Sequence, residues 1–237
     1  MRAAAALAAL LCSLPVQAHD LITAEVAERY LEQAKTWRAR AAVPAPSAQR
    51  ADAHYRLGVM LDEVRDLLNL DIATHGKVQG LASEFLVAEL ERQGAPLAHA
   101  DSRRRYLSNG RHFEEALKLA PHAAFAADAG FRLLRGRFYD SFDRDPLDWR
   151  SDSRALPTEI ALAEDLVARF PAHAAREEIE FIAVILYTRA ARSLPDRKLA
   201  ARYAAKARSA ITDFASRYPS SLRAAAMPVL REAIPQY

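Results

Sequence analysis

Apolar residues recur at steps of three and four along most of this chain, which is the spacing of one helix face. The clearest stripe lies near the C-terminal end and consists of Leu199, Tyr203, Ala207, Ala210, Ile211, Phe214 and Tyr218. Asp196 stands before this stripe, where a helix N-cap is expected, and Pro219 stands where the helix must end. The pattern predicts one amphipathic helix between these two residues.

A second segment is apolar on every side. Each position from Phe181 to Tyr187 carries an apolar side chain. A helix that lacks a polar face has to be covered by neighbours all round. We therefore expect the stretch from Ile179 to Tyr187 to form an inner helix.

The remaining chain also has the composition of a helical protein. It holds only 7 glycines and few runs of β-branched residues, so strands and hairpin turns have little material. The segment RARAAVPAPSAQR contains prolines and no apolar period, which indicates a loop between the first helices. The predicted fold class is all-α, with further helices at 20–40, 47–73, 77–93, 101–119, 122–138, 157–170 and 221–234.

The ends of several predicted helices share one pattern. Pro121, Pro171 and Pro219 repeat every 48 to 50 residues, and each follows small or apolar residues five and eight positions back. These pairs are Ala116 with Phe113, Leu166 with Ala163, and Phe214 with Ile211. Each pair lies on one helix face, and a new helix is expected after each proline. A unit this small cannot bury its own faces, so stacking of units must build the core.

The pattern resembles the tetratricopeptide-like repeats of bacterial cell-envelope proteins. FEEALKLAP is similar to the second half of a tetratricopeptide motif, and YPSS is similar to the repeat junctions of the class that includes the outer-membrane assembly lipoprotein and the cell-division coordinator. The resemblance implies a helix-turn-helix repeat solenoid, wound as a right-handed superhelix, that binds other envelope proteins. It also implies one repeat domain over 19–237, diverged at 19–108 and punctuated by proline at 109–237.

The N-terminal segment predicts export. Arg2 precedes an apolar run from Ala3 to Leu14, and Val-Gln-Ala at 16–18 is typical of a signal-peptidase site, so 1–18 is the expected signal peptide. The chain's 1 cysteine lies inside that segment and lacks the preceding leucine of a lipobox. We expect a periplasmic protein without a lipid anchor or a disulfide.

Charge and hydropathy exclude two classes of partner. The formal net charge is +3, from 33 Lys+Arg against 30 Asp+Glu, which gives no electrostatic case for nucleic acid. After the signal peptide, no apolar run approaches the roughly 18 to 20 residues of a membrane span. We therefore expect protein partners in the cell envelope and no transmembrane segment in the mature chain.

The sequence lacks the common motifs of catalysis and cofactor binding. The histidines are scattered, and the chain has no glycine-rich phosphate loop and no Gly-x-Ser-x-Gly elbow. We expect no catalytic activity and no cofactor. The alternative is a small metal-handling protein, because cleavage before His19 would leave an α-amine beside its imidazole, a pair that copper binds.

A long connection is predicted between the helices at 122–138 and 157–170. It exceeds the roughly 2 to 8 residues that usually join helix pairs, so we expect it to be a binding element or a flap. The expected partner-binding side chains are Tyr139, Arg144, Trp149 and Arg150, whose types are common in interface anchors. Its aspartates are a weaker case for calcium, because the EF-hand glycine and terminal glutamate are missing.

Overall fold

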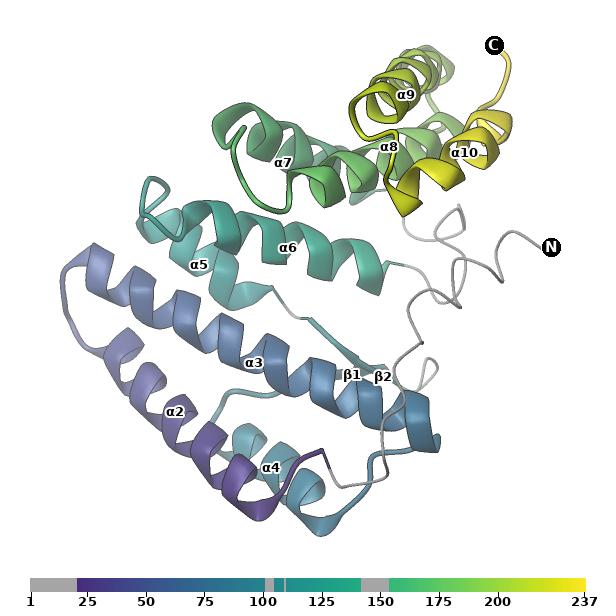
Figure 1. The fold of residues 1–237 in the computed structure, drawn as a ribbon. Coiled ribbons are helices and arrows are strands. Elements are labelled where there is room, and N and C mark those ends of the chain that lie inside the picture. The colour runs from purple at the N-terminus through teal and green to yellow at the C-terminus, as the bar shows by residue number, and fades with distance from the viewer. Residues whose placement is uncertain (1–20, 101–104, 109, 142–153) are drawn as a thin grey trace. The chain divides into compact units, whose positions relative to one another are not determined.

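The computed structural model describes residues 21–100, 105–108, 110–141 and 154–237 (Figure 1). The chain forms two compact units that meet in sequence at Asp140 and Ser141. We call the described residues 21–140 the N-terminal unit, and 141 with 154–237 the C-terminal unit. Both are built mainly of helices, so the predicted all-α class is confirmed. The predicted repeat segment 109–237 has residues in both units.

The N-terminal unit begins with three helices around one core. Helices α2 (Ala24–Ala42), α3 (Ser47–His75) and α4 (Leu81–Arg92) are in contact as the pairs α2–α3 and α2–α4. The core is made of aliphatic and aromatic side chains that include Tyr30, Leu57, Leu68, Leu86 and Leu90. Thr23 caps α2 by accepting a hydrogen bond from the Val26 N–H. Gly76, in the left-handed conformation, ends α3.

A short antiparallel hairpin follows and corrects one prediction. Strands β1 (Ala98–Ala100) and β2 (Arg105–Leu107) pair with Ala98 opposite Leu107. The helix expected over 101–119 is therefore wrong at 105–107, where the chain is a strand, and α5 begins only at Arg111 (Arg111–Leu119). The cause is tertiary, because β2 packs on α3 and exchanges hydrogen bonds with it. Gly110, with a φ of 61°, makes the turn from the hairpin into α5.

Helices α5 and α6 (Ala126–Asp140) complete the N-terminal unit. Helix α5 packs on both α3 and α6. Its Phe113 lies so close to Gly58 of α3 that a Cβ there would meet the ring at 2.8 Å. Tyr55 of α3 stacks on Phe125 at 4.7 Å between ring centroids, and its hydroxyl donates to the Asp128 carboxylate. Gly58 thus sets the close approach of α5 to α3.

The C-terminal unit is organised around one inner helix. It contains α7 (Leu156–Arg169), α8 (Arg176–Ser193), α9 (Arg197–Arg217), a 3-10 turn η2 (Leu222–Ala226) and α10 (Met227–Ala233). Helix α8 contacts α7, α9 and α10, and every residue from Phe181 to Leu186 is buried. The prediction of an inner helix is confirmed. The helix predicted at 221–234 is divided between η2 and α10 because Pro228 starts a new first turn.

The predicted boundaries of α9 are also confirmed. The Asp196 carboxylate accepts hydrogen bonds from the N–H groups of Lys198 and Leu199, and the helix ends at Arg217, before Pro219. Ile211 and Phe214 are buried on its apolar face. None of the helices in the described part of the chain has the length and apolar character that a bilayer crossing demands.

The proline-marked helix ends share one backbone geometry. After α5, α7 and α9 the capping residues Ala120, Phe170 and Tyr218 have φ between −148° and −125° and ψ between 55° and 73°. Each junction also has the same two turn hydrogen bonds. After Ala120, for example, the Ala123 N–H donates to the Ala120 carbonyl and the Ala126 N–H donates to the Ala123 carbonyl, and the equivalent bonds follow Phe170 and Tyr218. The residues five and eight positions before each proline are buried, as predicted. The repeat in sequence is therefore a repeat in local structure.

Candidate functional site

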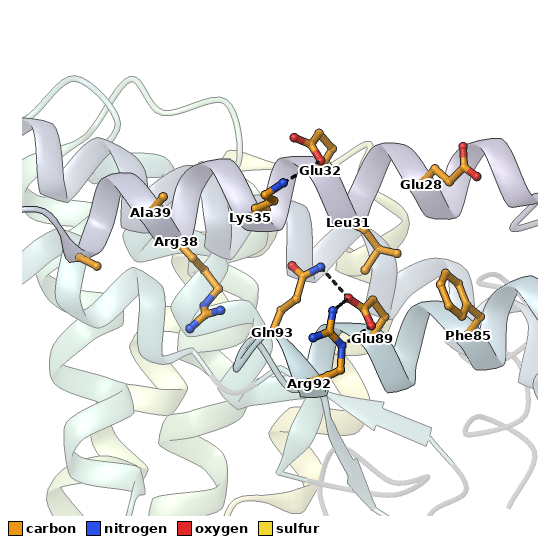
Figure 2. Close-up of a pocket in the computed structure, with 11 residues that line it drawn as sticks. Glu28, Leu31, Glu32, Lys35, Arg38, Ala39, Phe85, Glu89, Arg92 and Gln93 are labelled. Carbon is orange, nitrogen blue, oxygen red and sulfur yellow. Dashed lines mark hydrogen bonds and ion pairs between the residues drawn. The ribbon is translucent and has the colours of Figure 1, made fainter.

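An open groove of about 710 Å³ lies between α2 and α4 of the N-terminal unit (Figure 2). Leu31 and Arg38 point from α2 towards α4, and Phe85 and Gln93 point from α4 towards α2. The remaining lining residues are Glu28, Glu32, Lys35, Ala39 and Ala42 of α2 and Glu89 and Arg92 of α4. We call this feature the α2–α4 groove.

Helix α4 supplies an exposed apolar surface because it has two apolar faces. Leu86 and Leu90 are fully buried in the core, whereas Leu81 is 85% exposed and Phe85 is 57% exposed. Leu81 and Phe85 are one helical turn apart, so they lie on the same face. Leu31 of α2 is nearly buried and lines the groove opposite Phe85. A single exposed leucine is ordinary, but an exposed phenylalanine beside a groove indicates a binding surface.

The charges of the groove are arranged along its length. Residue numbers increase in the same direction along α2 and α4, so Glu28 and Phe85 lie at one end and Arg38 lies at the other (Figure 2). Among the described residues, neither Glu28 nor Arg38 has an ion-pair partner. Both are exposed. The groove therefore has an acidic end and a basic end.

The middle of the groove is internally compensated. Lys35 Nζ lies 4.0 Å from Glu32 Oε2, and Arg92 Nε donates to Glu89 Oε2 at 2.7 Å. Gln93 Nε2 donates to Glu89 at 3.1 Å. These hydrogen bonds, from Arg92 first and Gln93 second, lower the pKa of Glu89 to about 2. The polar middle of the groove is thus already satisfied.

Two histidines meet beside the basic end of the groove. His54 of α3 and His112 of α5 have their Nδ1 atoms 3.1 Å apart, so one imidazole donates and the other accepts. Burial, followed by the charges of His54, Arg111 and Arg38, lowers the pKa of His112 to about 4. Burial also lowers the pKa of His54. Burial and the nearby arginines therefore favour the neutral form of both imidazoles, and the arginines disfavour a metal cation there.

A network of buried charges lies at the other side of α3. Arg65 Nη1 donates to Asp62 Oδ1 at 2.6 Å, and the Ser108 hydroxyl donates to the same carboxylate at 3.2 Å. Burial raises the pKa of Asp62 and outweighs the opposing effect of Arg65. At the end of α6, burial raises the pKa of Asp140 to about 6 against the charges of Arg65 and Arg105. This network joins α3, α6 and the segment after β2, and it has a structural role.

Only part of the predicted binding connection lies in the described residues. Tyr139 is half-buried at the end of α6, where its ring packs edge-on against Phe138 at 5.1 Å and its carbonyl accepts from Arg105 Nη2 at 2.7 Å. Arg144, Trp149 and Arg150 lie outside the described residues, and so does His19. The partner-binding and copper interpretations of these residues stay predictions. Over the residues that are described, no three His, Cys, Asp or Glu side chains gather as metal ligands would.

The groove itself was not predicted from the sequence. Its walls are some fifty positions apart in the chain, because α3 lies between α2 and α4 in sequence although α2 and α4 contact each other directly. One signal was present, because Leu81 and Phe85 fall on a different helix face from Leu86 and Leu90. Such a second apolar stripe on a helix indicates a second partner.

Comparisons with protein-family models, curated proteins and solved structures find no match to this chain.

Proposed function

We propose that the protein is an exported, non-catalytic scaffold that binds other proteins of the cell envelope through a helical surface. The observation that carries this proposal is the α2–α4 groove, with Phe85 exposed at its acidic end. A helix laid in a groove between two helices is a recurring mode of protein recognition. Exposed aromatic side chains are frequent anchors in such interfaces.

The repeated junctions support the repeat-protein part of the proposal. Ala120, Phe170 and Tyr218 end their helices with the same backbone conformation and the same turn hydrogen bonds. Repeated helix-turn-helix units are typical of proteins that present extended binding surfaces. The tetratricopeptide-like solenoid, its right-handed winding and the periplasmic location belong to this proposal and rest on the sequence patterns of the chain.

Site-specific photocrosslinking tests the proposed binding surface. A photoreactive phenylalanine analogue replaces Phe85 in the full chain, expressed in bacteria, and irradiation then links it to whatever protein lies in the groove. We expect an adduct with another envelope protein, which mass spectrometry identifies. The matched control places the same analogue at Val229 of α10, which is 42% exposed and far from the groove in sequence.

The outcome separates a specific groove from a generally adhesive surface. Adducts with another envelope protein at Phe85 and not at Val229 support the proposal. Equal adducts at both positions, or no protein adduct at Phe85 in cells, contradict it. Fractionation of the same cells tests the periplasmic location independently, because release of the protein by osmotic shock is expected and retention with cytoplasmic markers is not.

A further inference from the structure

The α2–α4 groove is complementary in charge to itself. Glu28 and Arg38 lie ten positions apart on α2, which is about 15 Å at the helical rise per residue. Each lacks an ion-pair partner among the described residues. A second copy of α2, related by a two-fold axis near Gln33, would place its Arg38 beside Glu28 and its Glu28 beside Arg38. An isologous dimer requires this reciprocity.

The side-chain sizes along the groove follow the same symmetry. Phe85 projects at the acidic end, and Ala39 lies at the other end (Figure 2), three positions before Ala42, which also lines the groove. Under the same two-fold rotation, Phe85 of each copy would face the alanine surface of the other. A large aromatic side chain opposite small side chains allows close approach of two helices. Charge and shape therefore select the same antiparallel arrangement.

From this self-complementarity, we infer that a second copy of this chain occupies the α2–α4 groove when no other partner is bound, with the two α2 helices antiparallel. The inference rests on the proposed function, because the second copy covers the surface through which the scaffold would bind its partner. Burial of Phe85 supplies most of the attraction, since exposed ion pairs contribute little on their own. The charge pairs determine the orientation. Self-association and partner binding then exclude each other.

Charge-reversed variants of the full-length purified protein test this inference by light scattering and sedimentation. The first variant, Glu28→Lys with Glu32→Lys, makes the four charged α2 positions that line the groove all basic. The second, Lys35→Glu with Arg38→Glu, makes the same four positions all acidic. Each should weaken self-association by at least about tenfold, because like charges then face each other. An equimolar mixture should form dimers again, because an acidic groove then faces a basic one.

The control reverses the same number of charges on the same helix pair. Glu84 and Glu91 of α4 are exposed and do not line the groove. The variant Glu84→Lys with Glu91→Lys should dimerise as the wild type does. Circular dichroism confirms that each variant is folded, and the mixing experiment keeps the test valid if one variant is less stable.

Several results would overturn the inference. Wild-type protein that stays monomeric up to about 100 µM is one, since stable dimers form well below that concentration. A dimer that persists in both reversed variants, or a mixture of folded variants that stays monomeric, is another. If the wild type is monomeric but position 85 still crosslinks to another envelope protein, the inference fails and the proposed function stands. If the wild type is monomeric and position 85 crosslinks to no other envelope protein, the inference and the proposed function both fail.

Discussion

The side chain of Asn69 in α3 hydrogen-bonds to both the N–H and the carbonyl of Tyr106 in β2. The Asn69 side-chain amide donates to the Tyr106 carbonyl at 2.8 Å, and its oxygen accepts the Tyr106 N–H at 2.7 Å. The side chain thus substitutes for a neighbouring strand at the edge of the hairpin. This contact explains why the chain around Tyr106 is a strand although its local spacing favours a helix.

Replacement of Asn69 should therefore loosen the hairpin. We expect Asn69→Ala to lower the free energy of unfolding by about 1 to 3 kcal/mol, since two backbone groups lose their partner. Hydrogen exchange at the Tyr106 amide should accelerate more than exchange in the core of α3. The comparison variant Leu70→Ala, at a position 42% exposed, should have little effect. Unchanged protection at Tyr106 would show that Asn69 does not hold the strand.

The C-terminal unit should depend on one buried aromatic side chain. Phe214 is 1% exposed, and its ring lies 6.0 Å from Phe181 and 4.9 Å from Tyr218, measured between centroids. Ala183, Ile185 and Ala207 are buried in the same unit, as the predicted inner helix and apolar stripe require. We expect Phe214→Ala to cost about 3 to 5 kcal/mol of stability. Leu222→Ala, at a residue 71% exposed, is the control. Thermal melts that show less than about a third of the expected loss would contradict the packing.

Two buried groups of the N-terminal unit should make stability depend on pH in opposite directions. The pKa of His112 falls from 6.5 to about 4 on folding, so the unfolded chain binds more protons between these values and stability decreases as pH falls through them. The pKa of Asp140 rises from 3.8 to about 6, so the folded chain binds more protons and stability decreases as pH rises through that window. Each contribution to the free energy of unfolding is at most about 3 to 3.5 kcal/mol.

The variants His112→Asn and Asp140→Asn separate these contributions. Between pH 4 and pH 6.5, His112→Asn should remove part of the loss of stability on the acid side, and Asp140→Asn should remove part of the loss on the neutral side. Chemical denaturation at several pH values measures both. Asp62 is retained in both variants, so its raised pKa contributes equally to them. Profiles that shift in the same direction for both variants would contradict the assignment.

The connection from 139 to 155 should contribute to partner binding rather than to catalysis or calcium binding. If Trp149 is an interface anchor, Trp149→Ala should weaken capture of the partner by about 2 kcal/mol or more and leave the helical melt nearly unchanged. If Trp149 packs in the core, the same variant should lower the melting temperature and alter binding only through folding. Added calcium should shift neither property, and a calcium-dependent rise in melting temperature would favour the metal interpretation.

Much of the helical structure was predictable, because local signals agree there with tertiary packing. Asp196 as N-cap, the apolar stripe after it and Pro219 define α9 within a residue or two. The hairpin was not predictable, because Asn69 and Tyr106 are distant in sequence and override the local preference. The contact of His54 with His112 and the contact of α2 with α4 also arise only from tertiary packing, because the partners are distant in sequence. A candidate site made by such pairings has no motif in the sequence.

The most direct measurement of the central claim is the affinity of the protein partner for wild-type and Phe85→Ala protein. Once the partner has been identified by crosslinking, titration calorimetry gives both affinities, and the Phe85→Ala melt should match the wild type because Phe85 is exposed. If the α2–α4 groove is the binding surface, Phe85→Ala should weaken binding by at least about 2 kcal/mol, roughly thirtyfold. Equal affinities for the two proteins would contradict the assignment of the groove as the partner-binding site.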